Sequence, residues 1–302
     1  MNILSLFDGI SCGQQALKLS NIKYKKYFSS EINKNTINIT QKNFPKTIQL
    51  GDINAWKTWK LPRRIDLIMG GSPCQGFSLA GKGLNFDDPR SGLFFKFIEI
   101  LEHFKPKWFL LENVRMKKEW QDAITDLIKV EPLLINSKNF VPQNRLRLYW
   151  TNIPFNALPK RCETKIIDIL ESEVDQRYYL TERQLNKLNL DFKWSDKEII
   201  KHKGGKHQQD SIYRYDGIMS CLSAATHGAA RHLTKTYLPN GKIRRLTEIE
   251  CERLQGLPDN YTEGISSGNR YEALGNGWTV PVIAHIFKGM HLTNLKYELS
   301  LE

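Results

Sequence analysis

Short apolar runs alternate with amphipathic stretches through the first 150 residues. This alternation predicts buried strands at 3–7, 27–31, 66–70, 108–111 and 147–150, and helices at 14–19, 33–42 and around 94–101. Strands that alternate with helices indicate an α/β domain with a mostly parallel sheet and helices on both faces. Such sheets bind ligands beyond the carboxyl ends of their strands.

The pattern changes near Pro154 and Pro159. Residues 155–243 are polar and lysine-rich, with little periodicity, which indicates a smaller second domain. Periodicity returns at 246–254, where Thr247 and Glu250 have the spacing of a capping box, and an apolar helix is expected at 280–290. We therefore expect three parts: 1–153, 154–243, and 244–302, the last returning to the first domain.

Composition excludes several classes of protein. The 302 residues are 40% hydrophobic and 25% charged, close to the globular average, so a disordered or fibrous chain is excluded. No apolar run approaches the roughly 20 residues that cross a bilayer. The N-terminus has no basic region before Asp8, so it does not resemble a signal peptide. We expect a cytoplasmic protein with no membrane partner.

The net charge of +12 points to a polyanionic partner. Residues 201–245 hold nine basic and two acidic residues, a net charge of +7. This excess favours a surface that contacts phosphates, although a solvated lysine-rich face would have the same composition.

The cysteines and the first glycine turn indicate which kinds of site and cofactor the chain can have. The five cysteines are scattered without a CxxC pair, which disfavours a disulfide framework and a zinc site. The turn at 7–13, between a strand and a helix, suits a nucleotide-like cofactor. It lacks the three glycines of the dinucleotide fingerprint, so a NAD-dependent enzyme is disfavoured. Glu31 and Asp52 follow later strands and are candidates for ribose and adenine contacts, or ordinary strand-end and turn residues.

The strongest chemical signal is Cys74, in the loop Gly70–Ser78 that follows a buried strand. Loop amides and nearby cations at the ligand edge of a sheet can lower a thiol pKa and make a nucleophile. Glu112 ends the next strand, so both groups are expected at one rim. Arg145 and Arg147 are two residues apart and are expected on one face of a strand.

In order along the chain, these motifs resemble those of bacterial and phage C5-cytosine DNA methyltransferases. The resemblance covers nearly the whole sequence and rests on Phe7-Asp8-Gly9, Pro73-Cys74-Gln75, Glu112-Asn113-Val114, Gln143 with Arg145 and Arg147, Arg253 to Asp259, and Ala273 to Val282. It implies a Rossmann-like methyltransferase domain and a target recognition domain in the charged segment between Arg147 and Leu246.

The resemblance also implies a covalent mechanism on a cytosine flipped out of duplex DNA. Cys74 is expected to add to C6, Glu112 to bond the N3 and N4 edge, and Arg147 to hold O2. Arg145 is expected to help fix the closed catalytic loop.

The implied cofactor is S-adenosyl-L-methionine, with S-adenosyl-L-homocysteine as product. Phe7, Gly9 and Ile10 are expected around its methionine part and Glu31 with Ile32 at its ribose. Asp52 and Ile53 are expected at the adenine, while Leu93 and Asn276 close the pocket. The expected DNA contacts are Gln208, His227 and Arg231.

The chain departs from the family at two places and leaves alternatives open. Ser11-Cys12 stands where many members have paired glycines, and Gly277-Trp278 where a serine and a β-branched residue are usual. An RNA cytosine methyltransferase is disfavoured because the Cys-Phe-Thr signature of that branch is absent from the variable region. A silent DNA-binding relative is disfavoured because Cys74, Glu112 and both arginines are present. We expect a monomer from a bacterium or phage, with or without a separate restriction endonuclease.

Overall fold

The computed structural model describes residues 1–72, 89–195, 198–203, 211–224 and 234–298. The chain divides into two compact units. The first comprises residues 1–135, 146–157 and 282–302, and the second comprises 136–145 and 158–281. In the described part of the chain, no helix is long and apolar enough to cross a membrane.

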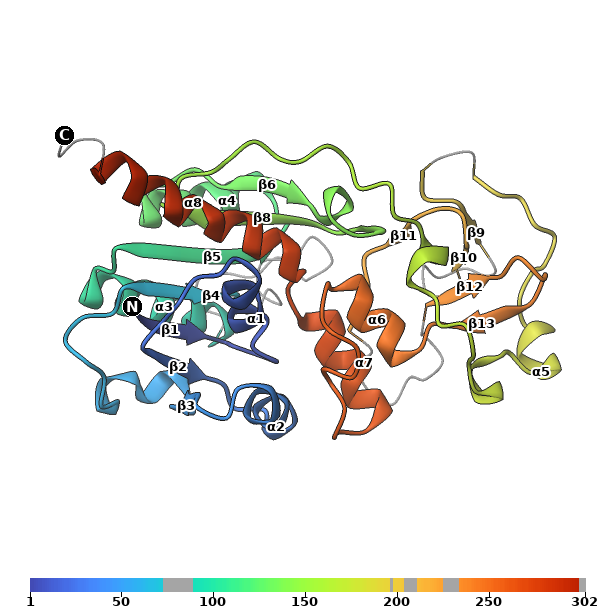
Figure 1. Ribbon diagram of the computed structural model, residues 1–302, viewed down its shortest axis with the longest axis horizontal. Coiled ribbons are helices and arrows are strands. Elements are labelled where there is room, and N and C mark those ends of the chain that lie inside the picture. The colour runs from blue at the N-terminus through green and yellow to red at the C-terminus, as the bar shows by residue number, and fades with distance from the viewer. Residues whose placement is uncertain (73–88, 196–197, 204–210, 225–233, 299–302) are drawn as a thin grey trace. The chain divides into compact units, whose positions relative to one another are not determined.

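The first unit is a twisted sheet covered by helices (Figure 1). Its elements are β1 (Asn2–Leu6), α1 (Cys12–Leu19), β2 (Lys26–Ser30), α2 (Lys34–Asn43), β3 (Ile48–Gln49), η1 (Ile53–Thr58), β4 (Leu67–Gly70), α3 (Pro89–Phe104), β5 (Trp108–Val114), α4 (Lys118–Ile128), β6 (Leu133–Asn136), β8 (Leu146–Thr151) and α8 (Val280–Glu298).

The strand order of this sheet is β3-β2-β1-β4-β5-β8-β6 among the described residues. The pairs β2–β3, β1–β2, β1–β4 and β4–β5 are parallel, whereas β5 and β8 are antiparallel. The prediction of a mostly parallel α/β sheet is therefore confirmed. The chain moves outward from β1 to β3 and then returns to the other side of β1, so strand order reverses between β1 and β4.

Alternating side chains give this sheet two buried faces. On one face, Leu4 and Leu6 of β1 pack in a core with Phe94 and Phe97 of α3 and Trp56 of η1. Each such side chain stabilises the fold by roughly 1.5–3 kcal/mol when fully buried.

Helix α1 lies close against the other face of the sheet. A Cβ built on Gly13 would be 2.5 Å from Met69 Cε and 3.3 Å from the Tyr27 hydroxyl. A larger residue at this position would require the end of the Met69 side chain to move.

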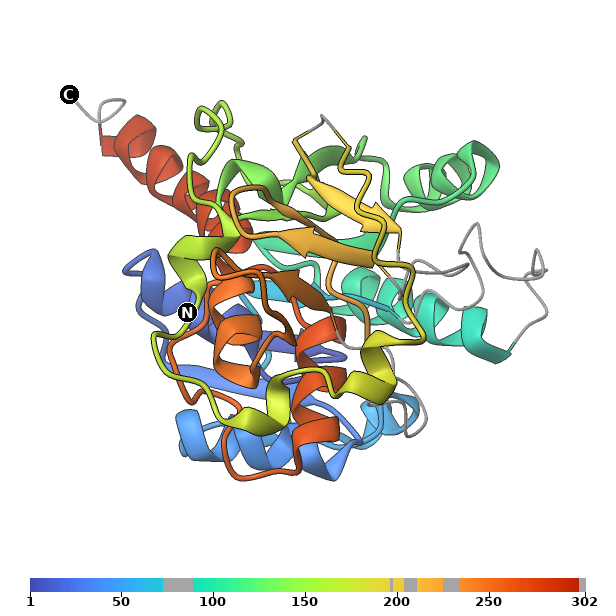
Figure 2. The same ribbon diagram turned by 90° about the vertical axis from the view of Figure 1, so that its right-hand side faces the viewer.

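The second unit holds shorter elements. They are η3 (Ser137–Asn139), β7 (Gln143–Asn144), η4 (Ile166–Ile169), η5 (Gln176–Tyr178), α5 (Glu182–Leu185), β9 (Lys201–Lys203), β10 (Ser211–Arg214), β11 (Met219–Ser220), β12 (Lys235–Tyr237), β13 (Ile243–Arg245), α6 (Glu248–Leu254) and α7 (Ser267–Asn276). Four strands form a sheet in the order β13-β12-β10-β9, drawn in yellow and orange in Figure 2, and β11 pairs with β7.

The division into units cuts the expected C-terminal part, 244–302. Residues up to 281 pack with the second unit, and only 282–302 pack with the first. The assignment of target recognition to 154–243 stays a prediction, since packing does not identify function.

Helix α6 is anchored by charge and by the expected cap. Thr247 Oγ1 accepts from the Glu250 amide at 3.1 Å, and Glu250 Oε2 accepts from the Thr247 amide at 2.9 Å. The Glu250 carboxylate also forms a buried ion pair with Arg244, at 2.6 Å. The predicted capping box is confirmed, and it joins α6 to β13.

Replacing Thr247 tests this anchor. Thr247→Ala should lower the free energy of unfolding by about 1 kcal/mol, because an orphan amide of the first helical turn loses its acceptor. Thr247→Ser keeps the hydroxyl and should unfold close to the wild type. Urea unfolding followed by circular dichroism measures both; equal losses in the two variants would contradict the cap.

Candidate functional site

The turn after β1 is held by a buried carboxylate. Asp8 accepts a hydrogen bond from the Tyr27 hydroxyl at 2.7 Å and from Ser29 Oγ at 2.9 Å, both on β2. Phe7, Gly9 and Ser11 have positive φ values of 57°, 57° and 60°. A non-glycine residue in this region is costly, so Asp8 and its partners stabilise a strained turn at the carboxyl end of β1.

Glu31 completes the same turn from the end of β2. Its Oε2 accepts from the Gly9 amide at 2.8 Å, and Oε1 accepts from the amides of Ile32 and Asn33 at 2.7 and 2.9 Å. Ile32 beside it is 72% exposed, unusual for a large apolar side chain. The expected cofactor residues Gly9, Glu31 and Ile32 therefore come together.

The end of β3 lies against the same edge. Ser30 Oγ donates to Gly51 O at 2.8 Å, and Asp52 Oδ1 caps η1 by accepting from the Asn54 amide at 2.9 Å. Ile53 is buried in the core.

The remaining expected cofactor residues differ in exposure. Ile10 is buried near the β1 turn, and Leu93 on α3 packs half-buried against the core. Asn276 belongs to the second unit, where it is exposed at the end of α7.

On the other side of the strand-order reversal, β4 and β5 carry the expected catalytic groups. β4 ends at Gly70, and the buried Ser72 accepts from Asn113 Nδ2 of β5 at 3.3 Å. Cys74, two residues further on, lies outside the described residues. The carboxyl ends of β4 and β5 are thus joined by a side-chain contact directly before the loop that carries the expected nucleophile.

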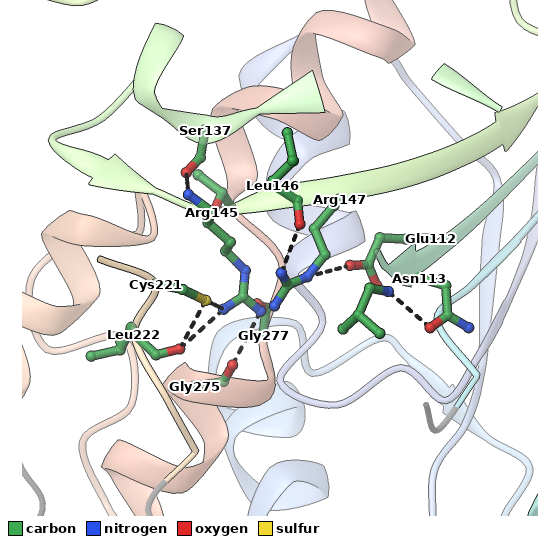
Figure 3. A network of polar contacts seen from close by, with 12 residues as sticks. Glu112, Asn113, Ser137, Arg145, Leu146, Arg147, Cys221, Leu222, Gly275 and Gly277 are labelled. Atoms are coloured by element: carbon green, nitrogen blue, oxygen red, sulfur yellow. Dashed lines mark hydrogen bonds and ion pairs between the residues drawn. The ribbon is translucent and has the colours of Figure 1, made fainter. Parts of the chain in front are cut away.

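Glu112 of β5 forms an ion pair with Arg147 of β8 (Figure 3). Arg147 Nε lies 3.1 Å from Glu112 Oε1, and both side chains are largely buried, 14% and 12% exposed. Arg147 Nη1 also donates to Leu146 O at 2.9 Å. A carboxylate and a guanidinium held side by side offer adjacent acceptor and donor atoms to a planar polar ligand.

Arg145 has a different environment, drawn in the same figure. Its Nη1 donates to Cys221 Sγ and Leu222 O at 3.1 and 3.2 Å, and its Nη2 donates to Gly275 O and Gly277 O at 3.1 and 2.9 Å. The expected strand does not include Arg145, whereas Arg147 lies in β8; that the two side chains share one face stays a prediction. The strand is interrupted at Arg145, between β7 and β8, and this residue packs within the second unit.

Comparison with known proteins decides the family. The model of the C-5 cytosine-specific DNA methylase family matches residues 1–291. The chain belongs to this family.

Individual relatives agree with this assignment. The chain is 32% identical to type II methyltransferase M.HpaII of Haemophilus parainfluenzae, over 93% of this chain and 86% of that one. It is 25% identical to orphan methyltransferase M.SPRI of Bacillus phage SPR, over 99% of both. Entamoeba histolytica methyltransferase EhMeth has a similar fold, with a TM-score of 0.72 at 19% identity, covering 96% and 97% of the two chains.

The expected DNA contacts of this methylase-family chain stay predictions. Gln208, His227 and Arg231 lie outside the described residues. The surrounding charge count overstates the cations available to phosphates. Arg244 is buried in its ion pair with Glu250, and Lys235 is 7% exposed.

No role was expected for Asp8 or Asn113 from the sequence, although both stand in family motifs. An acid directly after an apolar strand was the available signal for Asp8. No sequence pattern indicated that Asn113 would contact Ser72, since that pairing depends on the adjacency of β4 and β5.

The charge of Asp8 makes stability depend on pH. Burial is the largest influence on its pKa and raises it, against the opposing effect of its hydrogen bonds. The folded pKa therefore lies above the unfolded value of about 3.9. The corresponding stability is fully present below that unfolded value and is lost as pH rises through the folded pKa.

The variant Asp8→Asn removes this titration while preserving shape. We expect the free energy of unfolding of the wild type, relative to Asp8→Asn, to be greatest below the unfolded pKa of about 3.9 and to fall as the pH rises above it. Denaturant unfolding across this range measures the difference. A constant difference at every pH would show that Asp8 does not titrate above its ordinary range.

Proposed function

We propose that this chain is a DNA (cytosine-5-)-methyltransferase that acts through a covalent adduct between Cys74 and C6 of a flipped cytosine. The observation that carries the proposal is the Glu112–Arg147 pair on β5 and β8. The chain belongs to the C5-cytosine methylase family, and β5, which carries Glu112, neighbours β4, the strand that leads into Cys74.

The pair matches the hydrogen-bonding edge of cytosine. The carbonyl oxygen O2, the ring nitrogen N3 and the amino nitrogen N4 lie side by side along this edge. A guanidinium can donate to O2 while a carboxylate bonds N3 and N4, and the 3.1 Å separation of Arg147 and Glu112 suits such adjacent atoms. Reading that edge requires the base to leave the duplex stack, so the enzyme must flip it.

The chemistry then follows from these three side chains. The Cys74 thiolate attacks C6, and the electron pair of the C5–C6 bond makes C5 nucleophilic. As negative charge develops on the ring, N3 takes a proton from solvent; Glu112 bonds the N3 and N4 edge, and Arg147 holds O2. After C5 has been methylated, water takes the C5 proton, and the electrons of the C5–H bond restore the C5=C6 double bond. The Sγ–C6 bond then breaks with its electron pair on the Cys74 thiolate, and the N3 proton returns to solvent.

The residues after β1, β2 and β3 fit S-adenosyl-L-methionine. A Cβ on Gly9 or on Gly51 would meet no atom within 4 Å, so there is open space beside each turn. The Glu31 carboxylate suits ribose hydroxyls, exposed Ile32 offers an apolar surface, and Asp52 suits the adenine amino group. When bound, this cofactor supplies the electrophilic methyl group and leaves as S-adenosyl-L-homocysteine.

The proposed substrate is double-stranded DNA, as the family and its type II and orphan relatives suggest. We place recognition in 154–243, with Gln208, His227 and Arg231 as contacts, and we expect a cytoplasmic monomer of bacterial or phage origin. Relatives named type II and orphan are both present, so a separate endonuclease partner is compatible with this proposal.

Nucleoside analysis tests the function. Purified protein, S-adenosyl-L-methionine and plasmid DNA should yield 5-methyl-2′-deoxycytidine by mass spectrometry, and Cys74→Ala should lower the yield at least 1,000-fold, since no other thiolate replaces the nucleophile. Cys162→Ala is the matched control and should retain activity. Product in RNA but not in DNA would move the function to RNA, and turnover by Cys74→Ala would contradict the covalent step.

Glu31 is tested separately. Glu31→Ala should raise the KM for S-adenosyl-L-methionine roughly tenfold, equivalent to about 1.4 kcal/mol, because the ribose loses a carboxylate acceptor. Glu31→Gln keeps one acceptor oxygen and should show a smaller increase. Steady-state kinetics at saturating DNA gives both values, and an unchanged KM in Glu31→Ala would place the ribose elsewhere.

A further inference from the structure

Arg145 is a buried cation with neutral partners. It is 5% exposed, and its guanidinium donates, among the described residues, to three backbone carbonyls and the Cys221 thiol. Burying a guanidinium is costly unless its donors are satisfied. All four contacts lie inside the second unit, so Arg145 links separate segments of that unit.

Two of those carbonyls belong to the end of α7. The last carbonyls of a helix lack intrahelical partners and carry partial negative charge. The last turn of α7 contains no basic residue. Arg145, 130 positions earlier in the chain, supplies the missing cation by donating from Nη2 to both Gly275 O and Gly277 O.

The residue between these two carbonyls is Asn276. Gln255 holds the preceding turn by donating to Leu274 O at 2.7 Å. Gly275 packs so closely that a Cβ there would lie 2.3 Å from the Ala224 amide nitrogen. The backbone on both sides of Asn276 is therefore fixed while the residue itself is exposed.

We infer that Arg145 is a positioning residue for Asn276, and through it for the cofactor. The inference rests on the proposed function and on the expectation that Asn276 contacts S-adenosyl-L-methionine. The planar guanidinium donates from Nη2 to both α7 carbonyls while Nη1 donates to Leu222 O and Cys221 Sγ. Lysine keeps the charge, but its single nitrogen cannot take both places.

A double-mutant cycle on cofactor binding tests the inference. Calorimetry with S-adenosyl-L-homocysteine, without DNA, gives the Kd of the wild type, Arg145→Lys, Asn276→Ala and the double variant. Each single variant should bind roughly tenfold more weakly. If Arg145 acts through Asn276, the double variant should be within about twofold of Asn276→Ala, because the two effects are not independent.

Control measurements separate this role from general stability. Cys221→Ala removes a different acceptor of the same guanidinium and should bind like the wild type. In methylation assays, Arg145→Lys should raise the KM for the cofactor by a larger factor than it lowers kcat. Thermal unfolding checks that Arg145→Lys is folded. If Arg145→Lys does not fold, Arg145→Gln takes its place in the double-mutant cycle.

The contrary outcomes are distinct. Multiplied losses in the double variant, or wild-type Kd with reduced kcat in Arg145→Lys, would overturn the positioning role and leave the proposed function intact. A wild-type protein that does not bind S-adenosyl-L-homocysteine would overturn the proposed function and the inference together.

Discussion

The reversal of strand order between β1 and β4 is the constraint on which the candidate site depends. In open α/β sheets, crossover connections on the two sides of such a switch point diverge, and ligands bind beyond the strand ends there. In this sheet, the proposed cofactor residues Gly9, Glu31 and Asp52 follow β1, β2 and β3, while Glu112 lies on β5, next to the strand that leads into Cys74. The topology thus puts the reversal between these proposed cofactor residues and the proposed catalytic residues.

Buried polar groups hold the loops at this edge and in the second unit. Asp8 fixes the turn after β1, Glu31 bonds the Gly9 amide, and Arg145 fixes the end of α7. Asp8 and Arg145 are buried, and their burial is tolerated because hydrogen bonds satisfy their polar atoms, whereas Glu31 is only partly buried. The same loops carry the residues proposed to contact substrates, so local order and function depend on the same interactions.

Sequence patterns predicted the first unit well because long apolar runs and helical spacing dominate there. They predicted the strand at Leu4 and the cap at Thr247. They did not predict the strands of two to four residues in the second unit, which are too short to show a periodic pattern. They also did not predict the contacts of Arg145, because its partners Leu222 and Gly275 are distant in sequence and only tertiary packing brings them together.

The most direct measurement is the capture of the covalent adduct. Duplex DNA in which 5-fluorocytosine replaces cytosine blocks the final step, because C5 carries fluorine where a proton must leave. With S-adenosyl-L-methionine present, we expect a protein–DNA adduct that survives denaturant. After digestion, mass spectrometry should find the added mass of the nucleotide on the peptide that contains Cys74. Methylation of ordinary DNA without any such adduct, or an adduct on another residue, would contradict the central claim.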